Sequence, residues 1–143
     1  MANARHGGSR RRRPHPQPMG TPFLEFDLAG ELEQLAREPQ PIGGQNAKTL
    51  VKYDDLRIVL IALRADARIP GHQAEGRISV HTIRGHIRIR AIQRTFDLPA
   101  GSLLALDRGL PHDVEALEDS ALLLTIAWPG RNASKRASEA TTA

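Results

Sequence analysis

The sequence predicts an all-β fold, a jelly-roll barrel of about eight strands preceded by one short helix. Short runs of aliphatic and β-branched residues recur along most of the chain, and most of them end at Gly, Pro or Asp. No helical stretch between these runs is long enough for the crossover that a parallel sheet requires. Aromatic residues make up only 3% of the chain, so we expect a core of Leu, Ile, Val and Ala.

The composition limits the class of protein. With 143 residues the chain is long enough for one domain with its own core, but not for two of ordinary size. It has no cysteine, which excludes disulfides and thiolate metal sites and fits a reducing cytoplasm, where we expect the protein. No apolar run approaches the roughly 20 residues that span a bilayer, and the basic N-terminus lacks the apolar segment of a secretory signal. We therefore expect no membrane association.

Shifts in composition divide the chain into four segments. The first segment is rich in Gly, Pro and Arg, and the last consists mostly of small and polar residues. Neither has enough apolar side chains for burial to offset the conformational entropy that is lost on ordering. We predict a disordered basic N-terminal tail at residues 1–22, a short helix and linker at 23–45, the barrel at 46–128, and a disordered C-terminal tail at 129–143.

The helix prediction rests on Leu28, Leu32 and Leu35, which recur at helical spacing. Asp27 precedes them as a candidate N-cap, and Pro39 ends the pattern. The polar face of this helix is acidic, which argues against a membrane anchor. We expect the helix to pack on a sheet or on a partner subunit.

The barrel strands follow one another closely. Residues 56–64 carry Leu, Ile and Val at both odd and even positions, so this strand should be buried on both faces. In residues 86–92 isoleucine and arginine alternate at first, which places the isoleucines inward and the arginines in solvent. Glu118 and Asp119 predict a hairpin turn between the last two strands. The complete set of predicted strands is 49–53, 56–64, 77–84, 86–92, 94–98, 102–106, 112–116 and 121–128.

Two histidines follow turn residues directly. Pro70 and Gly71 precede His72, and a turn at Gly109 precedes His112. Because a strand that begins at a turn fixes its first side chain at the end of a sheet, we expect an imidazole pair near the mouth of the barrel.

The later of these histidines belongs to a motif that resembles one of the cupin superfamily. The second cupin motif, G-x5-P-x-G-x2-H-x3-N, aligns without gaps on Gly101, Gly109 and His112. Asp107 stands where the proline is usual, and Ala116 stands where the asparagine is usual. The resemblance covers roughly residues 46–128.

The first cupin motif, G-x5-H-x-H-x3-E-x6-G, aligns on His72 and Gly85 and is degenerate. Asp66 replaces the first glycine, Ala74 replaces the second histidine, and Ile78 replaces the glutamate. The chain thus resembles a small single-domain cupin, an RmlC-like jelly roll, and this resemblance implies the same barrel.

The resemblance also implies where a ligand binds. Cupins that hold a metal typically use two histidines and a glutamate of the first motif and the histidine of the second. Carried over, His72 and His112 remain as possible weak ligands of a divalent metal ion, whereas the residues at the other two positions cannot donate. Glu75 would point to the opposite face of an extended strand and could help only if a bulge rotates it inward. We predict a ligand-binding pocket lined by His72, Ala74, Ile78, Val80 and His112.

Two further histidines are predicted to lie outside the pocket. Strict alternation from an inward Ile78 places Val80 and Thr82 inward and His81 outward. His86 shares its parity with the arginines of its strand, so it should face solvent too.

Three functions stay open. The first is a small-molecule binding or sensory module with an incomplete metal site. The second is a divalent-metal-dependent enzyme of the oxygenase or isomerase type that uses the two motif histidines and waters. The third is a DNA-associated regulator whose tail binds phosphates through Arg10, Arg11, Arg12 and Arg13. We rank the first highest, because the site is short of ligands and no residue can be assigned a catalytic role.

We also expect a homodimer. Open jelly rolls leave sheet edges that need covering, and pairing two barrels is one way to cover them. The predicted strand at 49–53 and the helix are the expected contributors.

Overall fold

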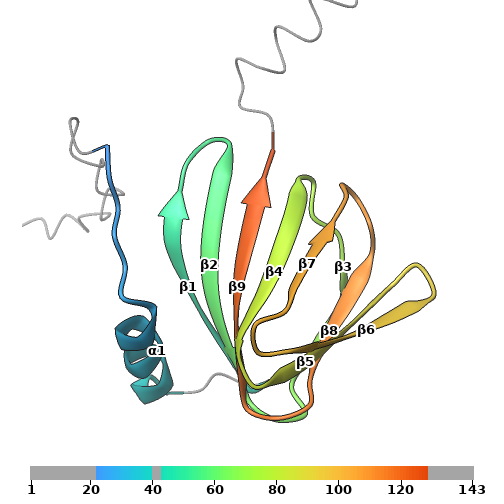
Figure 1. Ribbon diagram of the computed structural model, residues 1–143, viewed down its shortest axis with the longest axis horizontal. Helices are drawn as coiled ribbons and strands as arrows, with labels where there is room; N and C mark the ends of the chain where they lie inside the picture. Colours follow the sequence, from blue (N-terminus) through green and yellow to red (C-terminus); the bar gives the residue numbers. More distant parts are fainter. Residues whose placement is uncertain (1–21, 40–42, 129–143) are drawn as a thin grey trace, which may run out of the picture.

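The computed structural model describes residues 22–39 and 43–128. In this part of the chain, one helix is followed by nine strands that form two antiparallel sheets (Figure 1). The predicted N-terminal tail (apart from Pro22) and the predicted C-terminal tail lie outside the described residues. The elements are α1 (Leu28–Arg37), β1 (Gln45–Lys52), β2 (Leu56–Leu63), β3 (Arg68–His72), β4 (Arg77–Arg84), β5 (His86–Ala91), β6 (Arg94–Pro99), β7 (Leu103–Leu106), β8 (His112–Ala116) and β9 (Ser120–Ala127).

The strand order is that of a jelly roll. One sheet has the order β1-β2-β9-β4-β7 and the other has the order β3-β8-β5-β6. From β2 onward the chain changes sheet at every connection except the one between β5 and β6. In Figure 1 the strands of the larger sheet converge at one end and spread apart at the other. The predicted all-β jelly-roll fold is confirmed.

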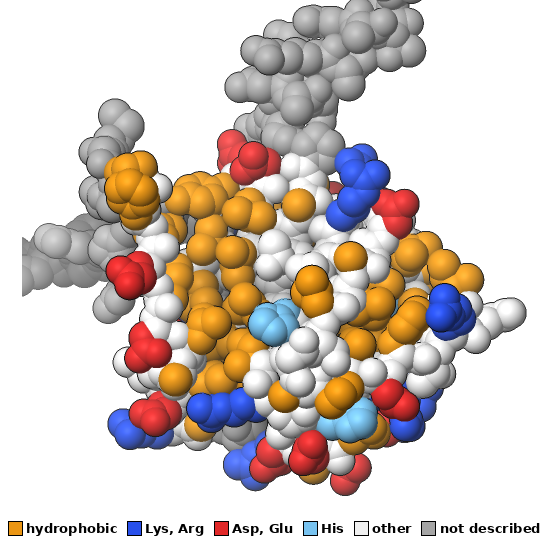
Figure 2. Space-filling view, in the orientation of Figure 1, with side chains coloured by type: hydrophobic (Ala, Val, Ile, Leu, Met, Phe, Trp, Pro, Cys, Tyr) orange, Lys and Arg blue, Asp and Glu red, His pale blue; other side chains and the backbone are white. Residues whose placement is uncertain are grey.

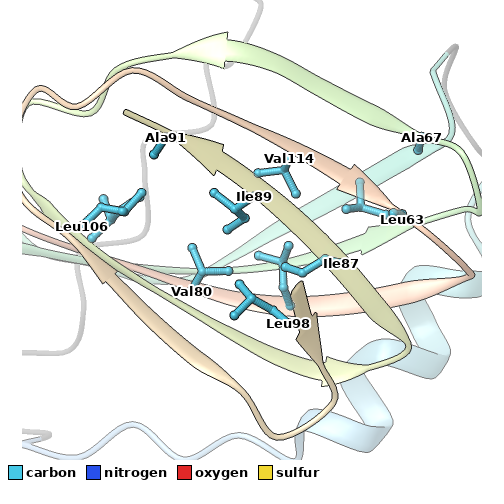
Figure 3. Close-up of a cluster of buried hydrophobic side chains, with 12 residues drawn as sticks. Leu63, Ala67, Val80, Ile87, Ile89, Ala91, Leu98, Leu106 and Val114 are labelled. Carbon is cyan, nitrogen blue, oxygen red and sulfur yellow. The ribbon is translucent and has the colours of Figure 1, made fainter. Parts of the chain in front are cut away.

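The larger core cluster lies between the two sheets (Figure 3). Ile87 and Ile89 of β5 are fully buried, and Val80 of β4 packs in the same cluster from the other sheet. Arg88 and Arg90 alternate with the isoleucines and are only partly buried. The predicted alternation of residues 86–92 is therefore confirmed, and it gives this sheet its inner and outer faces.

Gly85 allows the chain to pass from β4 directly into β5. Its φ angle is +77°, a conformation that L side chains rarely adopt. A Cβ atom here would also collide with Ser120 Oγ and with the carbonyl oxygen of Asp119. Ser120 Oγ instead accepts a hydrogen bond of 3.0 Å from the backbone N–H of His86. The crossing between the sheets therefore requires a glycine where it passes the start of β9.

The helix α1 packs on the outer face of the five-stranded sheet. Leu32 and Leu35 are buried there against Leu60 of β2, while Leu63 of the same strand enters the barrel core. β2 thus buries side chains on both faces, as the sequence predicts, and the helix covers a sheet, as expected. No helix within the described residues is long and apolar enough to cross a bilayer.

Side chains of β1 hold the two ends of this helix. Asp27 occupies the N-cap position, as predicted, but its side chain makes no capping hydrogen bond. Glu31 in the first turn instead forms an ion pair with Lys48. Near the C-terminal end, Asn46 Nδ2 donates to the Leu35 carbonyl oxygen at 3.3 Å.

The strand β3 is absent from the sequence-based prediction. Pro70 and Gly71 lie inside it rather than in a turn, and the ladder with β8 is irregular between Ile69 and His72. A proline lacks the N–H that a central strand needs, but an edge strand tolerates it. β3 is the edge of the four-stranded sheet, which explains why turn-forming residues still continue the strand.

The predicted hairpin turn at Glu118 and Asp119 is wrong. The strands β8 and β9 lie in different sheets and do not pair. Asp119 instead accepts a hydrogen bond of 2.8 Å from the backbone N–H of Ala65. The segment therefore crosses between the sheets, and a turn signal in the sequence does not distinguish such a crossing from a hairpin.

The substitution Leu35→Ala is expected to lower the free energy of unfolding by about 2–4 kcal/mol. The side chain is only 1% exposed, and its loss would leave a cavity between α1 and β2. Chemical denaturation measures the change. Leu103→Ala in β7 is the matched control, because that leucine is 66% exposed and its truncation should change stability by less than about 1 kcal/mol. Equal losses in the two variants would contradict the packing of the helix.

Candidate functional site

A cavity of about 510 Å³ opens between the inner faces of the two sheets. Aliphatic side chains make up most of its wall. They come from five strands, and they are Ile61, Ile69, Val80, Val114, Leu122 and Leu124. Apolar side chains also gather over β1 and β2 on the face shown in Figure 2.

His112 is the titratable side chain in the wall of this cavity. It begins β8, directly after the turn at Gly109, and is only 4% exposed. Its Nδ1 lies 3.0 Å from the Leu110 carbonyl oxygen. Because a carbonyl oxygen only accepts, Nδ1 carries the proton, and in the neutral ring Nε2 is then the basic nitrogen.

His72 is the last residue of β3, and its backbone pairs in register with that of His112. The ladder between β3 and β8 therefore brings the two predicted site histidines to one end of the four-stranded sheet. The predicted direction of the His72 imidazole lies outside what the structure describes.

The remaining predicted pocket residues fall into two adjoining hollows. Val80 is 2% exposed and lines the larger cavity with His112. Ala74 and Ile78 line a second hollow of about 330 Å³, and Leu124 lies in the wall of both. The structure thus places the replaced ligand positions beside the cavity of His112 rather than inside it.

Glu75 lines the second hollow together with Ala74, contrary to the expectation that it points away. That expectation assumed a continuous strand from His72 to Ile78. The structure has no strand at residues 73–76, with a bend at Glu75 and Gly76, so strict alternation does not apply there.

Sequence reasoning missed Arg57 and Trp128, which line the second hollow. Arg57 has the same parity in β2 as Ile61 and Leu63, two residues that contribute to the barrel core. A cation on the inward parity of an otherwise aliphatic strand was the signal that this position differs from its neighbours.

The described side chains do not make up an ordinary metal site. Structural and catalytic metal sites generally have three or four protein ligands. Among the side chains that the structure describes, which do not include that of His72, no group of three or more His, Cys, Asp or Glu is placed to hold a metal ion. Ala74 and Ile78 supply no donor atom at the positions where the resembled motif has a histidine and a glutamate.

The histidines of β4 and β5 lie outside both hollows. His81 is exposed on the outer face of β4, as predicted, while Val80 and Thr82 are buried inward. His86 is partly buried at the start of β5, and its Nε2 lies 3.8 Å from Asp97.

Glu115 ties the edge strand β3 to the centre of its sheet. Its carboxylate accepts hydrogen bonds from Arg68 of β3 at 3.3 Å and from Arg90 of β5 at 3.2 Å. Desolvation acts to raise the pKa of Glu115, but the two guanidinium groups outweigh it and hold the pKa below its ordinary value. These ion pairs support the strand that carries Ile69 and His72.

Comparisons with known proteins show which solved structures have a similar fold. No protein-family model matches the chain, and no curated protein is similar to it. Solved structures do match. A conserved protein of unknown function from Streptococcus pyogenes is 27% identical, with a TM-score of 0.58 over 62% of this chain and 78% of that one. An RmlC-like cupin from Shewanella frigidimarina is 20% identical, with a TM-score of 0.59 over 66% of this chain and 85% of that one.

An enzyme has the same fold over part of its length. A variant of salicylate 1,2-dioxygenase from Pseudoaminobacter salicylatoxidans is 14% identical, with a TM-score of 0.65 over 80% of this chain and 40% of that one. At these identities the similarities show the fold alone. The chain therefore has the fold of a small RmlC-like cupin, and the resemblance inferred from its motifs is confirmed at that level.

The variant Glu115→Gln is expected to be less stable than the wild type at neutral pH. A carboxyl whose pKa is lower in the folded than in the unfolded state contributes stability above its unfolded pKa and loses it as pH falls through the folded value. The difference between variant and wild type should therefore shrink below about pH 4. Denaturation at several pH values measures it, with the exposed Glu33→Gln on α1 as control. A difference that stays constant into strong acid would contradict the role of the ion pairs.

The double variant Ala74→His/Ile78→Glu restores the residue types of the first motif. Ile78 is only 5% exposed, so without metal the carboxylate should lower stability by roughly a few kcal/mol. Added zinc should recover stability, because it binds the folded state alone. The same pair of substitutions in a His112→Ala background is the control. Equal rescue by zinc in both backgrounds would mean that His112 does not belong to the restored site.

Proposed function

We propose that this protein is a small-molecule binding or sensory module whose ligand occupies the barrel cavity. The observation that carries the proposal is a hollow of about 510 Å³ with aliphatic walls and one buried imidazole. Ligand sites commonly have this size, mostly apolar lining and few polar groups that fix orientation. The aliphatic wall would hold the apolar body of the ligand, and His112 would orient a polar group.

A divalent-metal-dependent enzyme is the second candidate. The register that pairs His72 with His112 favours it, because two imidazoles on neighbouring strands can bind one cation. Two histidines are fewer ligands than such an enzyme normally has, so the enzyme hypothesis ranks below the binding module. Metal analysis of untagged wild-type protein and of His72→Ala/His112→Ala separates the two. Near one equivalent of metal in the wild type, lost in the double variant, would put the enzyme first.

The homodimer, the cytoplasmic location and a DNA-associated role of the arginine tail stay predictions. Light scattering tests the first of these. Comparison of the full chain with a variant lacking residues 1–22, in a DNA-binding assay over a range of salt concentrations, tests the third.

Filling the cavity is expected to abolish ligand binding. Ala47 lines the cavity from β1 and is exposed, so Ala47→Trp should occupy the space without disturbing the core. Ala105→Trp is the matched control, because Ala105 is also an exposed alanine in a strand of the same sheet but lies outside the cavity. Native mass spectrometry with a small-molecule library measures binding to all three proteins.

The proposal holds if wild type and Ala105→Trp retain the same bound molecules and Ala47→Trp loses them. It fails if no molecule of a chemically diverse library binds, or if the two tryptophan variants bind equally.

A further inference from the structure

Arg57 stands on the face of β2 that lines the barrel. Its partner in β9 is Ile126, whose own partner in β4 is Ile78, a buried residue of the core cluster. Side chains that are paired across neighbouring strands share a face of the sheet. The guanidinium group therefore lies on the inner face of this sheet, beside the aliphatic side chains of β4 and β9.

The charge of Arg57 is not compensated by the described residues. Its Nε atom is buried and has no hydrogen-bond partner, and the group forms no ion pair within the part of the chain that the structure describes. Its Cζ atom lies over the ring of Trp128, 5.6 Å from the centroid. A ring face attracts a cation but accepts no in-plane hydrogen bond from the guanidinium group, so the buried Nε donor stays unsatisfied.

A second cation adds to the positive potential at this point. Lys52 of β1 is the register partner of Arg57, and like charges directly opposite each other in a sheet are destabilising. Lys52 is exposed and, like Arg57, forms no ion pair with a described carboxylate. An anion bound beside Arg57 would relieve the repulsion and accept a hydrogen bond from the unsatisfied Nε donor.

The guanidinium group borders a hollow with fixed walls. The hollow has a volume of about 330 Å³, and Arg57, Trp128, Ala74 and Glu75 are part of its lining. The Gly109 N–H donates to the Ala74 carbonyl oxygen at 3.0 Å, which holds the segment that closes this end of the barrel. This hollow shares Leu124 with the larger cavity that His112 lines.

The close approach at Gly76 also fixes this wall. A Cβ atom at Gly76 would collide with the carbonyl oxygen of Ala127 at the end of β9. The segment therefore lies directly against the strand that leads to Trp128. A wall that is held by backbone contacts can present Arg57 and Trp128 at a constant distance from a ligand.

We propose that this hollow binds the carboxylate of a small organic acid and that Arg57 is its anchor. The apolar part of the acid extends past Leu124 into the larger cavity toward His112. The inference rests on the proposed function and adds the chemical class of the ligand. A planar carboxylate matches the fork of one guanidinium group, and Glu75 in the same wall disfavours a more highly charged anion.

The test compares acids with their uncharged amides. Hexanoate, benzoate and cyclohexanecarboxylate are titrated into the full chain by calorimetry, each alongside the amide of the same shape. The wild type should bind the best acid at least about tenfold more tightly than its amide, which is the scale of a charge-assisted hydrogen bond. Arg57→Gln should remove this preference and leave the affinity for the amide unchanged.

Two further variants make the result specific. Arg94→Gln is the matched control, because Arg94 also lies over an aromatic ring, 4.9 Å from the centroid of Phe96, but outside this hollow. It should keep the preference for the acid. Glu75→Gln should tighten binding of the acid several-fold, since it removes a like charge from the wall. If Arg57→Gln does not fold, Arg57→Lys is used in its place. It should weaken binding of the acid several-fold and leave the affinity for the amide unchanged.

Equal affinity for acid and amide in the wild type overturns the inference, and so does a preference that survives in Arg57→Gln. If uncharged molecules fill the cavity while the acids do not bind, the proposed function stands and the carboxylate inference fails. If none of the probes and no other small molecule binds, both fail.

Discussion

Aliphatic packing between the two sheets is the constraint on which the rest of this structure depends. The side chains of Leu63, Ile87 and Ala116 lie in one buried cluster that joins the sheets, and the single aromatic ring among the described residues that packs against it is Phe96. Interiors reach their normal density only when large and small side chains interdigitate. Three residues of this cluster, Val80, Val114 and Leu122, also line the hollow of about 510 Å³. The core and the cavity therefore share part of their side chains.

A histidine and an arginine lie at different points of this hollow space. His112 sits in the wall of the larger cavity and Arg57 in the wall of the smaller one, with Leu124 between them. Each is held by the local backbone, the histidine by its bond to the Leu110 carbonyl and the arginine by its place in β2. Small-molecule sites in general recognise shape through an apolar wall and orientation through a few polar groups. A buried donor without a hydrogen-bond partner, such as Arg57 Nε, lowers the stability of the fold.

The sequence allowed the fold to be predicted wherever the pattern of side chains is set by one sheet face. The alternation of isoleucine and arginine in β5 and the apolar run of β2 both have a direct physical cause in burial, so they were reliable. The strand β3 was missed because Pro70 and Gly71 are turn residues by local preference, and only their place at a sheet edge makes a strand of them. Local preference likewise predicted a hairpin at Glu118, where the chain in fact crosses between sheets.

The candidate site was predictable only in part, for a similar reason. His112 and Val80 share a cavity because each has a fixed parity in a regular strand. Ala74 and Glu75 lie between β3 and β4, outside any strand, so their directions follow from tertiary contacts such as the one with Gly109. Arg57 was overlooked although a cation in an aliphatic strand is conspicuous, because a strand that is buried on both faces does not tell which parity faces the barrel. The register with β9 decides this.

The proline in β3 also limits the pairing of strands from other chains with the edge of the four-stranded sheet. Exposed sheet edges are templates on which another chain can form a continuous ladder, with aggregation as the usual result. Pro70 has no N–H to offer such a chain, and the irregular register beside it interrupts the edge further. Edge-to-edge polymerisation through β3 is therefore blocked at the rim next to the cavity. Any assembly of several barrels by strand pairing would therefore have to use an edge other than β3.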